Sequence, residues 1–262
     1  MNALISALDH LLVRTRHFDA DRDNYALLLG GASSAPPAGD TPRRAIYTAG
    51  NTRLVLEESA DEEGLAGLCF AGDDRERLRR RMQRLGLIDT PTEDISACDD
   101  SIDWLRPEAS RGLRIGVTAT REAISVPAAD EGVVTGLDHA VITSAGAEGT
   151  AFLLGSQLGL DLRMDLSRPD WDARLLFFRC GDLIIEVFER LSAGAAGDAA
   201  RDRLYGLSWR VGNADEARRT LAAAGFDVSE VRQGRKPGTR VFTLRDRCAG
   251  VATLLLEPPP AA

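Results

Sequence analysis

The sequence has no long run of apolar residues, and this absence argues against a membrane-spanning helix. No stretch approaches the roughly 18 consecutive apolar residues that cross a bilayer. The first residues, MNALISALDHLLV, also lack the basic segment and the small-residue cleavage site of a secretory signal. We therefore expect a cytoplasmic protein that has no membrane partner.

Cysteine is scarce and scattered, which argues against a disulfide framework or a zinc finger. The four cysteines show no CxxC or comparable paired spacing; they are Cys69, Cys98, Cys180 and Cys248. This usage is typical of reduced thiols in a cytoplasm. Cys180 follows the apolar residues LLFFR, so we expect it to be a buried small hydrophobe.

An excess of basic residues is also missing. The formal net charge is −8, whereas binding to nucleic acid or to an anionic membrane favours a basic surface. The chain has no P-loop, no GxGxxG after a strand and no GxSxG. These absences argue against a nucleic-acid partner and against the common nucleotide-binding and serine-hydrolase sites.

What the sequence does contain is a repeat. The tripeptide Leu-Asp-His occurs at Leu8 and again at Leu137, about half the chain length later. In both places it opens an apolar segment typical of a strand, and a polar turn and a helix ending at glycine follow. We interpret residues 136–190 as a complete unit of one strand, one helix and three strands.

Two further segments share the strand, turn and helix plan but have no histidine. They start at Gly64 and at Tyr205, and in each an aspartate is expected to cap the helix. Short runs of branched and aromatic residues follow the helices and indicate strands. The chain therefore reads as four βαβββ modules, over about 8–58, 64–120, 136–190 and 204–257.

The segment between the second and third modules indicates a linker. Residues 121–134, REAISVPAADEGVV, contain proline, small residues and charge but no apolar stripe. We predict an N-terminal half over 1–122, a linker over 123–135 and a C-terminal half over 136–262. The fold class is α+β, with the modules paired into two cup-shaped mixed β-sheets and helices on the outside.

Four βαβββ modules, of which the first and third open with Leu-Asp-His, resemble the vicinal oxygen chelate superfamily. This superfamily includes glyoxalases, bleomycin-binding proteins and extradiol dioxygenases, and the resemblance covers about 8–258. It implies that modules pair around one divalent metal ion, whose ligands come from the first and last strands of each module.

Carried over by position, the resemblance identifies His139 and Glu186 as ligands in the third module. The first-strand position falls on Gly206 in the fourth module, where Glu257 is the last-strand candidate. In the N-terminal half, His10 is matched, with Glu57 as an alternative in a shifted register, whereas Gly67 takes the second histidine's place. The resemblance therefore implies a C-terminal site of His139, Glu186 and Glu257, with His10 and Glu57 as the alternative.

One imidazole and two carboxylates suit a borderline ion such as Zn, Ni, Co, Mn or Fe. Three protein ligands leave positions open for water and substrate, as a catalytic site requires. By analogy with the superfamily's isomerases, Glu257 or Glu186 would leave the ion and act as a base. The sequence does not choose between the two glutamates.

Several other residues are candidates for binding the substrate. Arg235, Lys236 and Arg240 lie in the basic loop GRKPGTR, which could bind a carboxylate or phosphate. Arg179 lies on an apolar strand, and Trp209 could line an apolar pocket. In contrast, His17 lies in a polar turn and is expected to be solvated.

The sequence leaves three functions open. The leading hypothesis is a metal-dependent, glyoxalase-like lyase or isomerase acting on a small oxygenated, anionic molecule. The alternatives are an extradiol ring-cleaving dioxygenase and a metal-free binding or resistance protein. Sequential pairing of modules is favoured, pairing of the first module with the fourth or third remains open, and a homodimer is allowed.

Overall fold

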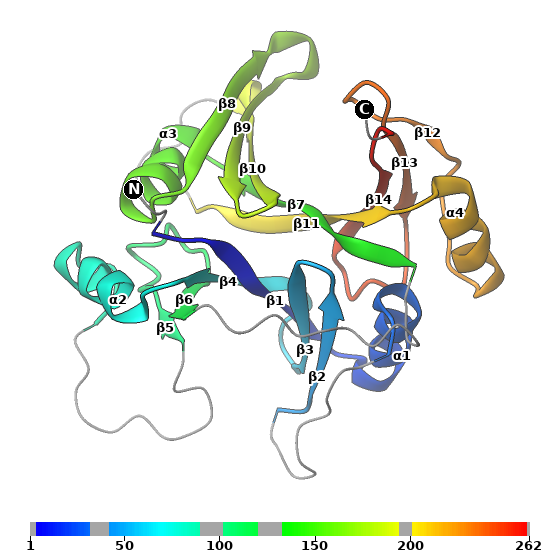
Figure 1. Ribbon diagram of the computed structural model, residues 1–262, viewed down its shortest axis with the longest axis horizontal. Helices are drawn as coiled ribbons and strands as arrows, with labels where there is room; N and C mark the ends of the chain where they lie inside the picture. The colour runs from blue at the N-terminus through cyan, green and yellow to red at the C-terminus, as the bar shows by residue number, and fades with distance from the viewer. Residues whose placement is uncertain (1–3, 32–41, 90–101, 120–132, 194–200, 261–262) are drawn as a thin grey trace. The chain divides into compact units, whose positions relative to one another are not determined.

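The computed structural model describes residues 4–31, 42–89, 102–119, 133–193 and 201–260 (Figure 1). The predicted linker over 123–135 lies mostly outside the described residues, and so does Cys98. Within the described part, the strands form one six-stranded and one eight-stranded sheet. Both sheets combine parallel and antiparallel pairs, and the helices are few. The prediction of an α+β fold with two mixed sheets is therefore confirmed.

The six-stranded sheet is built from the first two modules. Its strand order is β2-β3-β1-β4-β6-β5. β1 is parallel to β3, and β4 is parallel to β6, whereas β2 and β5 pair antiparallel with β3 and β6. The bounds are β1 Ala7–Thr15, β2 Arg44–Ala49, β3 Thr52–Glu58, β4 Gly64–Gly72, β5 Asp103–Trp104 and β6 Ile115–Ala119.

The eight-stranded sheet is built from the last two modules. Its strand order is β12-β13-β14-β11-β7-β10-β9-β8. The two modules are joined where β7 and β11, the first strand of each, lie next to one another. The bounds are β7 Val134–Ser144, β8 Asp161–Arg168, β9 Ala173–Cys180, β10 Leu183–Arg190, β11 Arg203–Val211, β12 Arg232–Gln233, β13 Arg240–Leu244 and β14 Ala252–Glu257.

Each module has one main helical segment after its first strand. These segments are α1 Phe18–Leu29, α2 Arg75–Arg84, α3 Ala147–Ala151 continuing as a π-helix over Phe152–Gln157, and α4 Ala214–Ala223. Short 3₁₀ turns cover Pro169–Trp171 and Leu191–Ala193. None of these described helices is long and apolar enough to cross a membrane.

The helix caps agree only partly with the sequence. Asp74 begins α2, and its side chain accepts a hydrogen bond of 2.9 Å from the backbone N–H of Arg77. In the fourth module an aspartate was expected, but Asn213 is the cap and accepts a bond of 2.9 Å from the N–H of Glu216. Asparagine and aspartate cap equally well, since either oxygen satisfies an unpaired N–H of the first turn.

The chain divides into two compact units. One contains Met1–Asp9, Gly67–Glu122 and Val141–Leu204, which are mainly the second and third modules. The other contains His10–Ala66, Ala123–Ala140 and Tyr205–Ala262, which are mainly the first and fourth. Sheet membership follows the predicted halves, whereas the compact units combine segments of both halves. The domain boundaries at 122 and 136 therefore stay a prediction.

Burial of the side chains alternates along β10. Leu183, Ile185 and Val187 are buried, whereas Ile184, Glu186 and Phe188 are intermediate in exposure. Successive side chains of a strand point to opposite faces, so Glu186 lies on the less covered face. In the antiparallel register, Glu186 is opposite Phe177 of β9.

The turn between β2 and β3 fixes the beginning of β7. The side chain of Asn51 accepts a bond of 2.8 Å from the N–H of Leu137 and donates one of 2.9 Å to the Leu137 carbonyl. A Cβ added at Gly50 would lie 2.2 Å from the carbonyl oxygen of Thr135. Gly50 also has a φ of +56°, so both the conformation and the close approach require glycine.

Candidate functional site

His139 lies on β7 and is held by its sequence neighbour. The Nδ1 atom of His139 is 2.9 Å from Oδ1 of Asp138. Oδ2 of Asp138 accepts a bond of 3.2 Å from Nε of Arg210 on β11. An ionised carboxylate only accepts hydrogen bonds, so Nδ1 carries the proton of this contact. Because Nδ1 is bonded to Asp138, Nε2 is the ring nitrogen through which His139 would bind an ion.

Asp138 is ionised more readily than an ordinary aspartate. Burial opposes its ionisation, but hydrogen bonds and charges from His139 and Arg210 outweigh burial and lower the pKa of Asp138. Carboxylates that hold the second nitrogen of a ligating histidine are common in metal sites, where they fix the tautomer and the ring. Asp138 is a residue that the sequence reasoning passed over, although its place next to His139 was visible.

Glu186 lies on β10, which is the strand next to β7 in the sheet. The residue opposite Ile184 in the register is Arg179, which places Arg179 on the same face as Glu186. Arg179 is exposed, and its Nε donates a bond of 3.1 Å to the carbonyl of Gly181 in the turn that follows β9.

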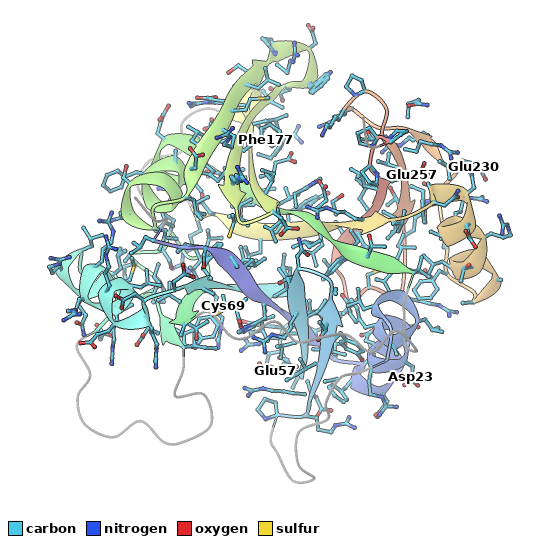
Figure 2. All side chains as sticks on the ribbon, in the orientation of Figure 1. Asp23, Glu57, Cys69, Phe177, Glu230 and Glu257 are labelled. Carbon is cyan, nitrogen blue, oxygen red and sulfur yellow. The ribbon has the colours of Figure 1, made fainter. Side chains whose placement is uncertain are left out.

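Glu257 lies at the end of β14 and already has partners. Its Oε2 accepts a bond of 2.7 Å from the N–H of Ala214, the first residue of α4, and is 3.5 Å from Nη1 of Arg240. A carboxylate at a helix N-terminus is stabilised by the unpaired N–H groups and the helix dipole. Glu257 thus serves the helix and an ion pair, and Figure 2 shows it on the strand beside α4.

The register of β11 and β14 explains this position of Glu257. Trp209 pairs with Leu255, and both are fully buried, so Glu257 two residues on shares their face of the sheet, which is the face of α4. Trp209 therefore belongs to the core under the helix. The opposite face carries Gly206, Ser208, Leu254 and Leu256, which together supply no imidazole or carboxylate.

In the N-terminal half, His10 and Glu57 are on the same face but far apart. His10 pairs with Arg53 and Arg14 pairs with Glu57, which places the two candidates four residues apart along the ladder, or about 13 Å at the rise of a strand. Glu57 also accepts bonds of 3.0 Å from Nε of Arg14 and 3.0 Å from Nε of Arg44. Buried between two arginines, Glu57 is committed to ion pairs.

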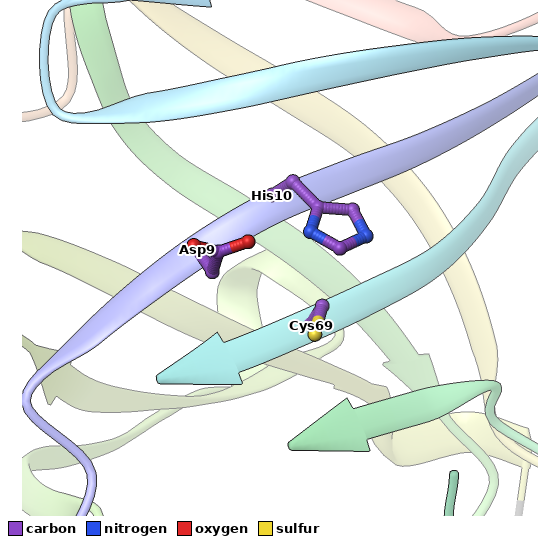
Figure 3. Close-up of side chains that lie close together, drawn as sticks. All are labelled: Asp9, His10 and Cys69. Atoms are coloured by element: carbon purple, nitrogen blue, oxygen red, sulfur yellow. The ribbon is translucent and has the colours of Figure 1, made fainter. Parts of the chain in front are cut away.

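His10 instead lies close to two residues that the sequence reasoning missed. One ligand atom each from Asp9, His10 and Cys69 lies within 4.8 Å of the other two, and Figure 3 shows the three side chains on β1 and β4, which are neighbours in the sheet. Among the described residues, this is the one group of three His, Cys, Asp or Glu side chains that meets this distance. The ligand atoms of His139, Glu186 and Glu257 do not form such a group.

A signal for Cys69 was present in the sequence. Gly67 is the position that matches the superfamily's second histidine, and alternation places Cys69 on the same face two residues later. The scattered spacing of the cysteines hid this relationship.

The remaining candidates are on the surface or in ion pairs. Arg235 and Lys236 are exposed, and Arg240 bonds to Asp215 of α4 at 2.9 Å. His17 is exposed just before α1, as the polar turn predicted.

One hollow of about 430 Å³ lies where the end of β1 meets the segment before β4 and the first residues of β4. It is lined by charged and small side chains, none of them a predicted site residue: Arg14, Arg16, Asp61, Glu62, Glu63, Gly64, Leu65 and Ala66. Arg14 pairs with Glu57 and Glu62, and Arg16 donates to the carbonyl of Asp61, so both guanidinium groups have partners within the chain.

Comparison with known proteins agrees with the reading of the last two modules. Residues 138–243 match the family model of the glyoxalase/bleomycin resistance protein/dioxygenase superfamily. The predicted resemblance to this superfamily is confirmed. A search of curated proteins found no match.

Solved structures of this superfamily share the fold over nearly the whole chain. A halotolerant catechol dioxygenase, BphC, has a TM-score of 0.73 at 11% identity and covers 97% of this chain and 87% of its own. The 2,3-dioxygenase LapB from Pseudomonas sp. KL28 has a TM-score of 0.71 at 16% identity, covering 98% and 93%. The Mn(II)-bound glyoxalase from Novosphingobium aromaticivorans has a TM-score of 0.69 at 18% identity, covering 98% and 83%. At such identities, the similarity establishes the fold.

The divalent ion that this superfamily implies can be tested against the donors present. His139 is held at Nδ1 by Asp138, and Glu186 supplies a carboxylate from the next strand of the sheet. Glu257 would first have to leave Ala214 and Arg240. An imidazole and a carboxylate are donor types that suit a divalent ion, so His139 and Glu186 fit it by their chemistry, and the three-residue set stays a prediction.

Proposed function

We propose that the protein is a divalent-metal-dependent enzyme of the lyase or isomerase type, acting on a small oxygenated, anionic molecule in its C-terminal half. The observation that carries the proposal is the Asp138–His139 pair, in which Nδ1 is occupied by the carboxylate at 2.9 Å. An imidazole held in this way by a charge-assisted bond is typical of a metal ligand. An ordinary core histidine needs no such support from an arginine-bound aspartate.

In this proposal, His139 and Glu186 hold the ion, and Asp138 and Arg210 keep the imidazole in position. A bound ion would supply Lewis-acid stabilisation of negative charge on vicinal oxygens of the substrate. Glu186 shares its face of the sheet with Ile184 and Phe188 and is opposite Phe177, so its strand neighbours are apolar. In this proposal Glu186 is also the base that accepts a proton from the substrate.

Arg179 is the cation best placed to bind the substrate's charge. It lies on the face of Glu186 and is exposed, so a carboxylate or phosphate can reach its guanidinium. Arg235 and Lys236 are a second exposed basic pair, whereas Arg240 is engaged by Asp215 and Glu257.

The sharpest test uses the fact that the chain has only three histidines. Their ring signals in a proton–nitrogen NMR spectrum are assigned with His10→Ala, His17→Ala and His139→Ala. Adding Mn²⁺ is expected to broaden the His139 signal at substoichiometric ion, while the exposed His17 serves as an internal control. Glu186→Gln should raise the Mn²⁺ concentration that this broadening requires.

A second candidate, a metal-free binding protein, is favoured by the fourth module. Gly206 and Leu254 stand on the face where the superfamily's ligands would be, and Glu257 is engaged by α4. If Mn²⁺, Fe²⁺, Co²⁺, Ni²⁺ and Zn²⁺ all leave the His139 signal unchanged, the enzyme proposal is abandoned for this one. Yellow ring-opened product from a catechol with Fe²⁺ would instead indicate the dioxygenase.

A further inference from the structure

We propose that Asp9, His10 and Cys69 form a second metal site, separate from the one at His139, that selects a thiophilic divalent cation such as Zn²⁺ or Co²⁺. The donor atoms of the three side chains lie within 4.8 Å of one another. Ligands that surround one ion must be mutually close in this way, because each lies about 2.0–2.3 Å from the metal.

The chemistry of the three donors defines the ion. A thiolate, an imidazole and a carboxylate form a mixed sulfur, nitrogen and oxygen set, which suits Zn²⁺ and Co²⁺. Mg²⁺, Ca²⁺ and Mn²⁺ prefer oxygen ligands and are disfavoured by sulfur. The proposed ion at His139 has no sulfur donor, so the two sites differ in the cations that they select.

Burial supports a site within the sheet. His10 is 7% exposed and Cys69 is 1% exposed, and both lie on neighbouring strands of one sheet, as Figure 3 shows. Strand positions are held by the backbone ladder, so the donors are already gathered before an ion arrives. A preformed site of this kind binds without the cost of ordering a loop.

The same three residue types could suggest a nucleophilic cysteine assisted by histidine and aspartate. Such a relay places the histidine between the other two groups and requires a sulfur that the substrate can reach. Here each donor lies close to both of the others, and the sulfur is covered. The geometry therefore favours convergence on an ion.

The second LDH repeat offers a comparison within the chain. When Gly67 and Gly206 are aligned, Ser208 takes the place of Cys69. Cys69→Ser is therefore a conservative change, which gives the second module the serine that the fourth module has at the equivalent position. Cys180→Ser is the matched control, because Cys180 is also a buried cysteine of a β-strand.

The experiment is a titration of chelator-treated full-length protein with Co²⁺ under reducing, oxygen-free conditions. The wild type and Cys180→Ser are expected to show an intense sulfur-to-cobalt charge-transfer band in the near ultraviolet. Cys69→Ser should lose the band, and its Co²⁺ affinity for this site should fall by about 100-fold or more, since outer-shell changes alone cost about 10–100-fold. Asp9→Asn should weaken binding while keeping a sulfur band at high Co²⁺.

The proposal is overturned if the wild type shows no sulfur band. It is also overturned if the band survives in a Cys69→Ser variant whose cooperative thermal unfolding shows that it is folded. Asp9→Asn provides an independent readout should Cys69→Ser unfold. His139→Ala must keep the band. If Mn²⁺ does not broaden the His139 signal but Co²⁺ gives the sulfur band, only the proposed function is refuted. If Mn²⁺ broadens the His139 signal but Co²⁺ gives no sulfur band, only this second site is refuted.

Discussion

The two LDH tripeptides of this chain share a local arrangement but differ in what surrounds it. In both, the aspartate lies next to the ring of the following histidine. In the second copy the third group is the cation Arg210, which bonds to Asp138, whereas in the first copy it is the sulfur of Cys69, which lies close to both Asp9 and His10. The two copies of one tripeptide thus differ in the side chain that the neighbouring strand supplies.

The leucine, in contrast, is buried in both copies of the tripeptide. Leu8 and Leu137 are 1% and 0% exposed, so the leucine has the same buried role in both copies. The aspartate and the histidine are the positions at which the copies have separate partners. Substitutions at the three positions should therefore have different effects.

The largest change in stability is expected at the leucines. Leu137→Ala and Leu8→Ala should each lower the free energy of unfolding by about 2–5 kcal/mol, because a buried side chain is removed and a cavity remains. Urea unfolding followed by circular dichroism measures both values. The exposed Leu27 on α1 is the control, and its change to alanine should cost less than about 0.5 kcal/mol. Unequal losses at the two leucines would show that the copies are not equivalent even in the core.

The next largest effect is expected on metal affinity at Asp138. Asp138→Asn keeps an oxygen acceptor but removes the charge that holds His139, so Mn²⁺ affinity should fall by about 10–100-fold. Calorimetry or the broadening of the His139 signal measures it. Asp165→Asn is the matched control, since Asp165 is likewise paired with an arginine, Arg174. An equal loss in both variants would mean that surface charge, and not the histidine, determines the affinity.

A smaller effect is expected at the turn that supports β7. Asn51→Ala removes two hydrogen bonds and leaves the N–H and carbonyl of Leu137 without them, which should cost about 1–3 kcal/mol. Unfolding measurements give the loss, and hydrogen exchange of the Leu137 amide should accelerate. Unchanged exchange at Leu137 would show that the side chain does not protect this strand.

The smallest effect is expected at Arg210. Arg210→Gln removes one of the partners that lower the pKa of Asp138, so the pKa should rise towards the ordinary value of about 3.9. A carboxyl whose folded pKa is depressed adds stability above its unfolded pKa and loses it as the pH falls through the folded value. The metal-free variant should therefore be less stable than the wild type at pH 7, by less than about 1 kcal/mol, and this difference should vanish in acid. A constant difference at all pH values would point to lost packing.

The sequence predicted the fold better than the site, for a physical reason. Hydrophobic alternation and glycine stops are local patterns, so they located the modules, but the face of Glu186, expected to be buried, is the less buried face of β10. Glu257 was chosen by counting from Gly250, but only the pairing of Trp209 with Leu255 shows that Glu257 belongs to the face of α4. Facing in a strand changes with every residue, so an uncertainty of one position reverses the answer.

Cys69 shows the other limit of the sequence. Its proximity to His10 depends on β1 and β4 being neighbours, which joins residues that are almost sixty positions apart. The spacing of cysteines along the chain contains no trace of this pairing. Arg210 is similar, since its bond to Asp138 depends on the contact of β11 with β7.

The two hydrogen bonds between the Asn51 side chain and the backbone of Leu137 affect whether the C-terminal half can fold without the N-terminal half. A fragment beginning near residue 133 would keep every residue that matched the superfamily, yet its opening strand would lose the amide that satisfies its backbone. Duplicated halves are often treated as independent folding units. The turn before β3 supports the first strand of the third module, so the C-terminal half expressed alone should be less stable than the full chain.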